Sequence, residues 1–153
     1  MYGPFIGVIG AGSCSDETAS LACQVGGEIA RRGGVLVCGG LGGVMQAAAR
    51  GAKEFGGLTV GILPGPSVTE ANPYIDVPVA TNMGQARNAI IVQTVQALIA
   101  VAGGFGTLSE MALALKIGKT VVTLWPQFDI AGVRRVETAQ EAMDVVLQQL
   151  IAG

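Results

Sequence analysis

Histidine is absent from the 153-residue sequence, aromatic residues are limited to one tryptophan, two tyrosines and four phenylalanines, and only 13% of the residues are charged. Without histidine the chain cannot form a Ser-His-Asp or Cys-His nucleophile system, an H-E-x-x-H zinc site or an imidazole base. Any acid–base chemistry must come from Asp, Glu, Lys, Tyr or Cys side chains, and the sequence predicts no metal site.

Charge of either sign is scarce, because nine Lys and Arg residues stand against eleven Asp and Glu residues, with a net charge of −2 and a pI of about 5.0. A protein that binds DNA or RNA through its phosphates normally carries a basic surplus or a basic patch. We therefore expect no nucleic-acid partner.

The three cysteines, Cys14, Cys23 and Cys38, have no C-x-x-C spacing, and an odd number does not make a disulfide framework. They indicate reduced thiols and a cytoplasmic location. The first ten residues contain no basic segment, so we expect no signal peptide.

One stretch, residues 88–109, carries no charge over 22 positions and is long enough to raise the question of a membrane span. It contains Asn88, Gln93, Gln96 and a glycine pair that interrupts the apolar pattern. These features predict a buried helix followed by a buried strand, and no membrane contact.

Short apolar runs alternate with helical patterns along the whole chain. The expected strands are 5–10, 35–38, 58–63, 79–81, 97–102 and 120–125, and the expected helices are 16–32, 44–55, 84–96, 107–117 and 139–151, with 64–77 as a loop. Alternation of this kind predicts an α/β fold, namely a Rossmann-like doubly wound parallel sheet with helices on both faces. Residues 1–153 are expected to form one domain.

Glycine accounts for 24 of the 153 residues, about twice its usual share of ~7%. Three glycine loops, 10–13, 39–43 and 103–107, each follow an expected strand and lead into a helix. Such loops either make plain strand-to-helix turns or let free backbone N–H groups bind an anion. Three loops at one sheet edge favour a phosphate of a nucleotide or sugar. The candidate ligand-binding residues of the first two loops are Gly10, Gly12, Ser13, Gly40 and Gly42.

None of the three loops completes the G-x-G-x-x-G pattern of dinucleotide binding, because Ser15, Met45 and Ser109 stand at its third glycine. No acidic residue ends the second expected strand, and no G-x-x-x-x-G-K-[ST] motif occurs. The sequence therefore disfavours an NAD dehydrogenase and a P-loop hydrolase.

Between Asp76 and Lys116 the only charged residues are Arg87 and Glu110. Each has an ordinary structural explanation, because Thr107 to Glu110 reads as a helix capping box and Arg87 as a solvated or ion-paired side chain. The alternative is that both face one cleft. Arg87 would then hold an anion, and Glu110 would act as a base or stabilise a cation.

Residues 102–110, AGGFGTLSE, resemble the PGGxGTxxE motif of the Lonely Guy family, the lysine-decarboxylase-like proteins of the wider SLOG group. Residues 39–45 are similar to that family's GGGxxGLM stretch, and Arg87 precedes the motif by fifteen residues, as the family's arginine does. The short branch that includes the molybdenum cofactor carrier proteins is more similar still, because it has an Arg-Asn pair and a run like 100–119. Ala102 replaces the motif's proline, and Asn88 replaces the usual lysine.

The resemblance implies roles for particular residues. Lonely Guy enzymes cleave the N-glycosidic bond of cytokinin nucleoside 5′-monophosphates, and the carriers bind a pterin cofactor without chemistry. Arg87 and Glu110 would be the catalytic pair, and Gly43 and Met45 would line the nucleotide side. The implied phosphate-binding residues are Gly103, Gly104, Gly106 and Thr107.

The first hypothesis is therefore the binding of a phosphorylated ligand, an AMP-like nucleotide or molybdopterin. The alternative is a phosphoribohydrolase that acts on nucleoside 5′-monophosphates, and a third hypothesis, DNA binding by analogy with DNA-processing relatives of the group, conflicts with the acidic pI. A pyridoxal-phosphate decarboxylase is not expected, because Lys53, Lys116 and Lys119 have no recognisable setting for that cofactor.

A mean hydropathy of +0.55 leaves more apolar surface than a small monomer easily buries. Within the expected helix 84–96, Ile90, Ile91, Val92 and Val95 are spread around the circumference, so one face could pack on a partner chain. We expect a homodimer or a larger homo-oligomer, which the family resemblance also implies.

Overall fold

The alternating pattern folds into a parallel sheet of seven strands across residues 2–153, the part of the chain that this computed structural model describes. The strands are β1 (Phe5–Ile9), β2 (Val35–Cys38), β3 (Thr59–Leu63), β4 (Val77–Ala80), β5 (Ala97–Val101), β6 (Thr120–Leu124) and β7 (Arg134–Arg135). Their spatial order is β4-β3-β2-β1-β5-β6-β7, and every neighbouring pair is parallel.

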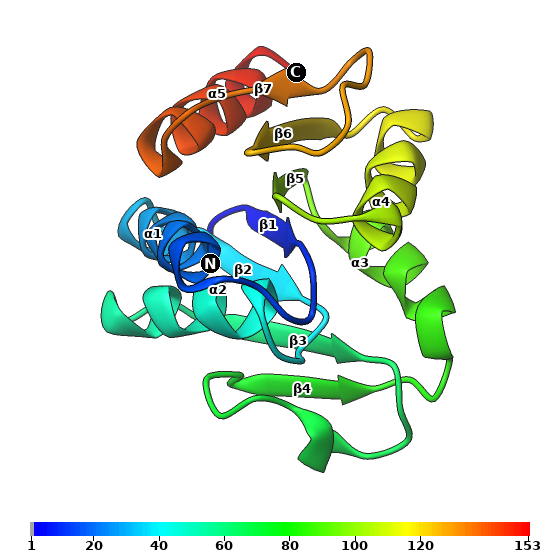
Figure 1. Cartoon of the computed structure of the whole chain (residues 1–153). Coiled ribbons are helices and arrows are strands. Elements are labelled where there is room, and N and C mark those ends of the chain that lie inside the picture. Colours follow the sequence, from blue (N-terminus) through cyan, green and yellow to red (C-terminus); the bar gives the residue numbers. More distant parts are fainter. Residues whose placement is uncertain (1) are drawn as a thin grey trace.

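Helices cover both faces of this sheet (Figure 1). They are α1 (Asp16–Arg31), α2 (Val44–Glu54), α3 (Arg87–Thr94), α4 (Phe105–Lys116) and α5 (Ala139–Ala152), with short 3₁₀ helices η1 (Val68–Glu70) and η2 (Gly84–Ala86). One apolar core lies under α1, α2 and α5, and a second lies under α3 and α4. Because both sheet faces are covered, β1, β2 and β5 are continuous apolar runs. The α/β Rossmann-like prediction is confirmed.

The winding of the chain reverses between β1 and β5. The first four strands move outward from β1 to β4, and the chain then returns to place β5 on the other side of β1. In open α/β sheets, ligands bind at such a switch point, in the crevice outside the carboxyl ends of the strands. The topology therefore directs attention to the loops that follow β1, β2 and β5.

The helices differ in how their N-termini are satisfied. Ser15 caps α1 by accepting a hydrogen bond from the Thr18 backbone N–H at 3.2 Å, and Thr138 caps α5 by accepting one from Glu141 N–H at 3.1 Å. The N-caps of α2 and α4 are glycines, Gly43 and Gly104, which provide no side-chain acceptor. In α2 the Val44 N–H bonds the Ala11 carbonyl oxygen, whereas the first-turn N–H groups of α4 are left for water or a ligand.

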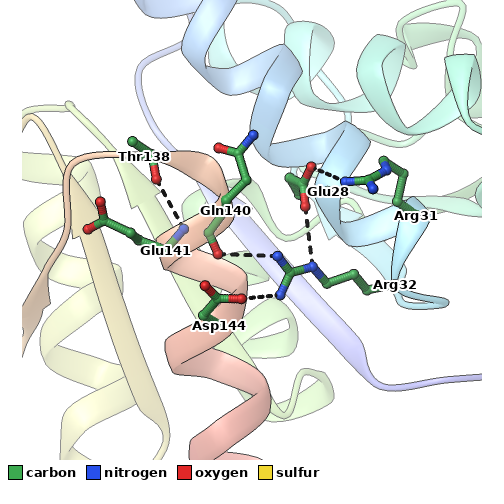
Figure 2. A network of polar contacts seen from close by, with 7 residues as sticks. All are labelled: Glu28, Arg31, Arg32, Thr138, Gln140, Glu141 and Asp144. Carbon is green, nitrogen blue, oxygen red and sulfur yellow. Dashed lines mark hydrogen bonds and ion pairs between the residues drawn. The ribbon is translucent and has the colours of Figure 1, made fainter.

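A network of charged side chains joins α1 to α5 (Figure 2). Glu28 accepts hydrogen bonds from Arg31 at 2.5 Å and from Arg32 at 3.2 Å. Arg32 also donates to Asp144 at 2.6 Å and reaches the Gln140 carbonyl oxygen at 3.5 Å. The network fixes the last helix of the chain against the first.

The capping box predicted from Thr107 to Glu110 was wrong. The helix expected over 107–117 begins at Phe105, because Gly104 takes the N-cap position. Thr107 is therefore inside the first turn, with its side chain over Gly103, and Glu110 lies in the second turn, too far along the helix to cap it. This removes the ordinary explanation for Glu110.

Other expected boundaries also shift. The helix expected over 84–96 divides into η2 and α3, and it ends where Val95 adopts an extended conformation that leads into β5. The strand expected over 79–81 is β4, at 77–80. The loop expected over 64–77 contains η1, and β7 was not predicted, because two arginines carry no strand signal.

The apolar face expected on helix 84–96 does not reach the surface. Ile91, Val92 and Val95 are buried in their own domain and Ile90 is half-buried, because α3 packs on the sheet and on α4. The uncharged stretch 88–109 forms α3, β5 and the start of α4. Every helix within residues 2–153 is too short or too polar to cross a membrane.

Candidate functional site

The first and second glycine loops are packed directly against each other. The Val44 backbone N–H donates to the Ala11 carbonyl oxygen at 3.1 Å. Gly43 has a φ of 60°, and a Cβ there would collide with the Ala11 carbonyl and the Gly12 backbone. A Cβ at Gly10 would lie 2.7 Å from the Val44 side chain. Gly10 and Gly43 thus allow the two loops to meet at the carboxyl edge of the sheet.

The third glycine loop leaves its N–H groups accessible. Gly103 has a φ of 97°, and the Thr107 side chain lies over it. An added Cβ at Gly106 meets nothing within 4 Å, and at Gly104 its nearest neighbour is Gln127 Oε1 at 4.0 Å. Open glycines at an uncapped helix start let an anion approach the backbone N–H groups closely.

The position of the family's motif proline has a different backbone here. Ala102 has a φ of 49°, whereas proline is fixed near −65°. The Ala102 N–H also donates to the Leu124 carbonyl oxygen at 2.8 Å, a bond that proline cannot make. This loop conformation is therefore incompatible with the proline that the Lonely Guy motif carries at the position.

A hollow of about 250 Å³ lies between the first and third loops. Its lining includes Ser13 from the first loop, Gly103 and Gly104 from the third, and Gln127 from the loop after β6. Ser13 and the start of α4 thus face the same space. This volume lies just below the about 300–1,000 Å³ of typical ligand pockets. It therefore suits a phosphate with only part of its organic group.

Arg87 is buried, with 9% of its surface exposed. Its Nε donates to the Ile62 carbonyl oxygen at 2.8 Å, and its Nη1 donates to Asn88 Oδ1. A side chain at Gly39 would meet the Arg87 guanidinium at 2.5 Å, so this glycine makes room for it. Within residues 2–153 Arg87 forms no ion pair, and the prediction of a solvated or ion-paired side chain was wrong.

Glu110 is 8% exposed, and burial raises its pKa from 4.5 to about 7, an effect that Arg87 partly offsets. Its carboxylate has no ion pair within 4.0 Å and no hydrogen bond in the described part of the chain. Burial likewise lowers the pKa of Arg87, and Glu110 opposes that shift. Both side chains line a cavity of about 60 Å³ together with Gly10, Gly39 and Met45. A carboxyl group and a guanidinium thus face each other without direct contact.

A third hollow, of about 380 Å³, has Arg87, Asn88, Gly106 and Ser109 in its lining. The structure therefore brings Arg87, Glu110, Met45 and the start of α4 together at the carboxyl edge of the sheet. Gly40 and Gly42 contribute differently, because a Cβ on Gly40 would meet Leu63 and one on Gly42 would meet the Gly12 carbonyl.

Sequence reasoning missed three contributors to the site. Gly39 belonged to a recognised glycine run, but its contact with Arg87 is tertiary. The Ile62 carbonyl that orients Arg87 left no signal in the sequence. Gln127 lies in a loop for which no role was predicted.

The model of the SLOG cluster4 family matches residues 4–150. Two solved structures cover nearly the whole chain. The molybdenum cofactor binding protein of Rippkaea orientalis is 35% identical with a TM-score of 0.92, over 98% of this chain and 99% of that one. The molybdenum cofactor carrier protein of Chlamydomonas reinhardtii is 37% identical with a TM-score of 0.88, over 99% and 100%.

Two relatives by sequence complete the comparison. An uncharacterized protein of Archaeoglobus fulgidus is 51% identical over 95% of this chain and 96% of its own length. A cytokinin riboside 5′-monophosphate phosphoribohydrolase of Mycobacterium tuberculosis is 39% identical over 62% of this chain. The match spans about half of that enzyme, 52% of its length.

Proposed function

The chain belongs to the SLOG cluster4 family, and we propose that it binds a phosphorylated pterin-type or nucleotide ligand at the carboxyl edge of its sheet, in the manner of a molybdenum cofactor carrier. Molybdopterin and AMP are the ligands that this chemistry favours. The phosphate would be bound by the first-turn N–H groups of α4, with Thr107 and Ser13 beside it. The two solved structures named above support this proposal through full-length similarity to proteins of that kind.

The observation that carries the proposal is the difference between helix starts at this edge. Ser15 and Thr138 satisfy the N-termini of α1 and α5, whereas Gly104 leaves that of α4 unsatisfied beside the 250 Å³ hollow. Free N–H groups and the positive end of the helix dipole both attract a phosphate.

Calorimetric titration with AMP, other nucleotides and pterin phosphates tests the proposal. The Gly106→Val variant should abolish binding, because its side chain fills open space in front of the α4 start and meets no protein atom within 4 Å of the Cβ. Ala112→Val, at an exposed position of the same helix, is the matched control and should bind as the natural protein does. If none of these ligands binds, the proposal is contradicted.

A second function is favoured by the unneutralised pair of Arg87 and Glu110. A carboxyl group with a pKa of about 7 is roughly half ionised at neutral pH, which suits general base catalysis. In a phosphoribohydrolase, Glu110 would activate the water that adds to the ribose C1′ or stabilise the oxocarbenium-like sugar as the N-glycosidic bond breaks. Arg87 would orient the ribose phosphate.

Release of free adenine from AMP tests the hydrolase function. Glu110→Gln should remove at least about 100-fold of the rate, the size expected for general acid–base catalysis, and the variant should not lose stability, so that the lost rate cannot come from unfolding. Asp76 is the matched control, because, despite partial burial, hydrogen bonds from Lys53 and Thr59 lower its pKa and hold it in a structural role, so Asp76→Asn should lose stability and retain the rate. If the natural protein releases no base, only the binding function stands.

We also propose a homo-oligomer. Leu113 and Ile117 lie four residues apart on α4 and are 39% and 41% exposed, so they form part of an apolar strip that faces outward. Light scattering at micromolar concentration should give at least twice the monomer mass, and Leu113→Glu should reduce it.

The compartment that fits these residues is the cytoplasm, which is reducing. Cys14, Cys23 and Cys38 are all free thiols, and burial raises the pKa of Cys38 to about 11, so that it stays protonated. Cell fractionation checks this location.

A further inference from the structure

An aromatic pair lies at the carboxyl edge of β5 and β6, and the binding of a phosphate does not require it. Phe105, the first residue of α4, is 80% exposed. The centroid of its ring lies 5.5 Å from that of Phe128, and the two planes are inclined by 36°. A large apolar ring kept this exposed next to a binding loop indicates a contact surface.

The surroundings of the pair point to a small ligand. Along the chain, Phe105 lies between residues that line two hollows, because Gly103 and Gly104 line one and Gly106 lines the other. Gln127, which precedes Phe128, lines the first hollow. Anion-binding N–H groups, a ring surface and an amide therefore follow one another along the same edge.

We propose that Phe105 and Phe128 form a stacking surface for the planar heteroaromatic ring of the phosphorylated ligand, with the Gln127 amide at the edge of that ring. The inference rests on the proposed function and assigns the residues that would bind the ring of its ligand. Aromatic side chains stack on any flat heterocycle, and an amide supplies both a donor and an acceptor for its polar edge. The ligand is then a phosphate ester that carries a purine- or pterin-sized ring, and a sugar phosphate alone binds weakly.

The test compares three probes, AMP, neopterin monophosphate and ribose 5-phosphate, on three proteins. Phe105→Ala removes the exposed ring. Phe55→Ala is the matched control, because Phe55 is 55% exposed at the other end of α2 and packs beside Gly27 of α1. The sole tryptophan, Trp125, directly follows β6 at this edge and is 42% exposed, so its fluorescence reports ring binding alongside calorimetry.

Phe105→Ala should weaken the better of the two ring-bearing probes about tenfold or more, the size expected for a lost base–aromatic stack. It should leave the affinity for ribose 5-phosphate within twofold, and Phe55→Ala should change neither. Equal weakening of all probes, or no weakening of the ring-bearing ones, overturns the inference while the proposed function stands.

Two further results would also overturn the inference. A mass that falls to the monomer in Phe105→Ala, with unchanged ligand affinity, assigns the ring to a contact between copies of the chain and overturns the stacking role. If none of the three probes binds the natural protein, the inference and the proposed function fail together.

Discussion

Two buried carboxylates of this chain are treated in opposite ways. Glu28 is 6% exposed and accepts hydrogen bonds from Arg31 and Arg32, the second of which continues to Asp144 on α5 (Figure 2). Glu110 is 8% exposed, and its carboxylate meets only the cavity that it shares with Arg87. The two carboxylates are buried to nearly the same degree, but only Glu28 has partners that donate hydrogen bonds to it.

The difference separates the part of the molecule that holds the fold from the part where we propose that a ligand binds. A buried charge without a partner costs free energy, so the fold retains one only where other interactions compensate. Between α1 and α5 the charges of the Glu28 network are paired, and side chains cap the starts of both helices. At the carboxyl edge of β5 the charges are unpaired, the helix start is uncapped, and Ala102 and Trp125 hold φ values of 49° and 52°. Strain and unmet polar groups gather where a ligand can relieve them.

The largest expected effect is the pH dependence that Glu110 imposes. Its pKa is about 7 in the folded chain and 4.5 unfolded, so between these values the folded state binds a proton that the unfolded state does not. The free energy of unfolding should therefore fall as pH rises from about 4.5 to about 7, by about 3 kcal/mol in all. Urea unfolding across this range measures it.

Glu110→Gln isolates this contribution, because glutamine does not titrate. The variant should be about 3 kcal/mol more stable than the natural protein at pH 8 and equally stable at pH 4. Glu54→Gln, at an exposed position, should leave the pH profile unchanged. Parallel profiles for Glu110→Gln and the natural protein would mean that Glu110 is solvated, and the contrast with Glu28 would disappear.

The second effect has the opposite sign. Glu28→Gln removes the charge that pairs with two arginines, and it should lower the free energy of unfolding by about 2 kcal/mol. The value lies below that of a fully buried pair, because the Arg31 side chain is 53% exposed and can regain water. Ligand affinity should not change. If Glu28→Gln lowered the ligand affinity and left the free energy of unfolding unchanged, the roles of the two carboxylates would be reversed.

The sequence predicted much of this arrangement but not the pairing. Strands β1, β2 and β5 and the starts of α1 and α5 were predicted, because continuous apolar runs and helix-start signals are local. The placement of Arg87 beside Glu110 follows from a resemblance and from topology.

Glu28 pairs with arginines three and four positions away, but the rest of its network and the contacts of Arg87 are distant in sequence. Arg32 meets Asp144 across 112 positions, and Arg87 meets the Ile62 carbonyl across 25. The start of α4 was misplaced because the Thr107 to Glu110 pattern is a valid local capping signal, and the conformation of the Gly103-Gly104 loop overrides it.

The third effect concerns backbone strain at Ala102, at the carboxyl edge of β5. Ala102→Gly should raise the free energy of unfolding by about 1 kcal/mol, because glycine adopts a positive φ without the Cβ clash that alanine suffers. Ala112→Gly, the same change inside α4, should lower it by about 1 kcal/mol. Thermal unfolding of the two variants compares them directly. A loss of stability in both would show that Ala102 is not strained.

The smallest effect lies at the exposed end of the Glu28 network. Asp144 is 65% exposed at its side chain, so its ion pair with Arg32 is open to water despite the 2.6 Å separation. Asp144→Asn should lower the free energy of unfolding by less than about 0.5 kcal/mol, and the difference should vanish in 1 M NaCl, as exposed pairs are weak and screened. Glu28→Gln should keep most of its effect at that salt concentration, because burial protects its hydrogen bonds from screening. If the two substitutions respond alike to salt, then Glu28 is not a protected carboxylate and Asp144 is not a solvated one by comparison. The contrast between Glu28, which is buried with partners, and Glu110, which is buried without them, would then lose its basis.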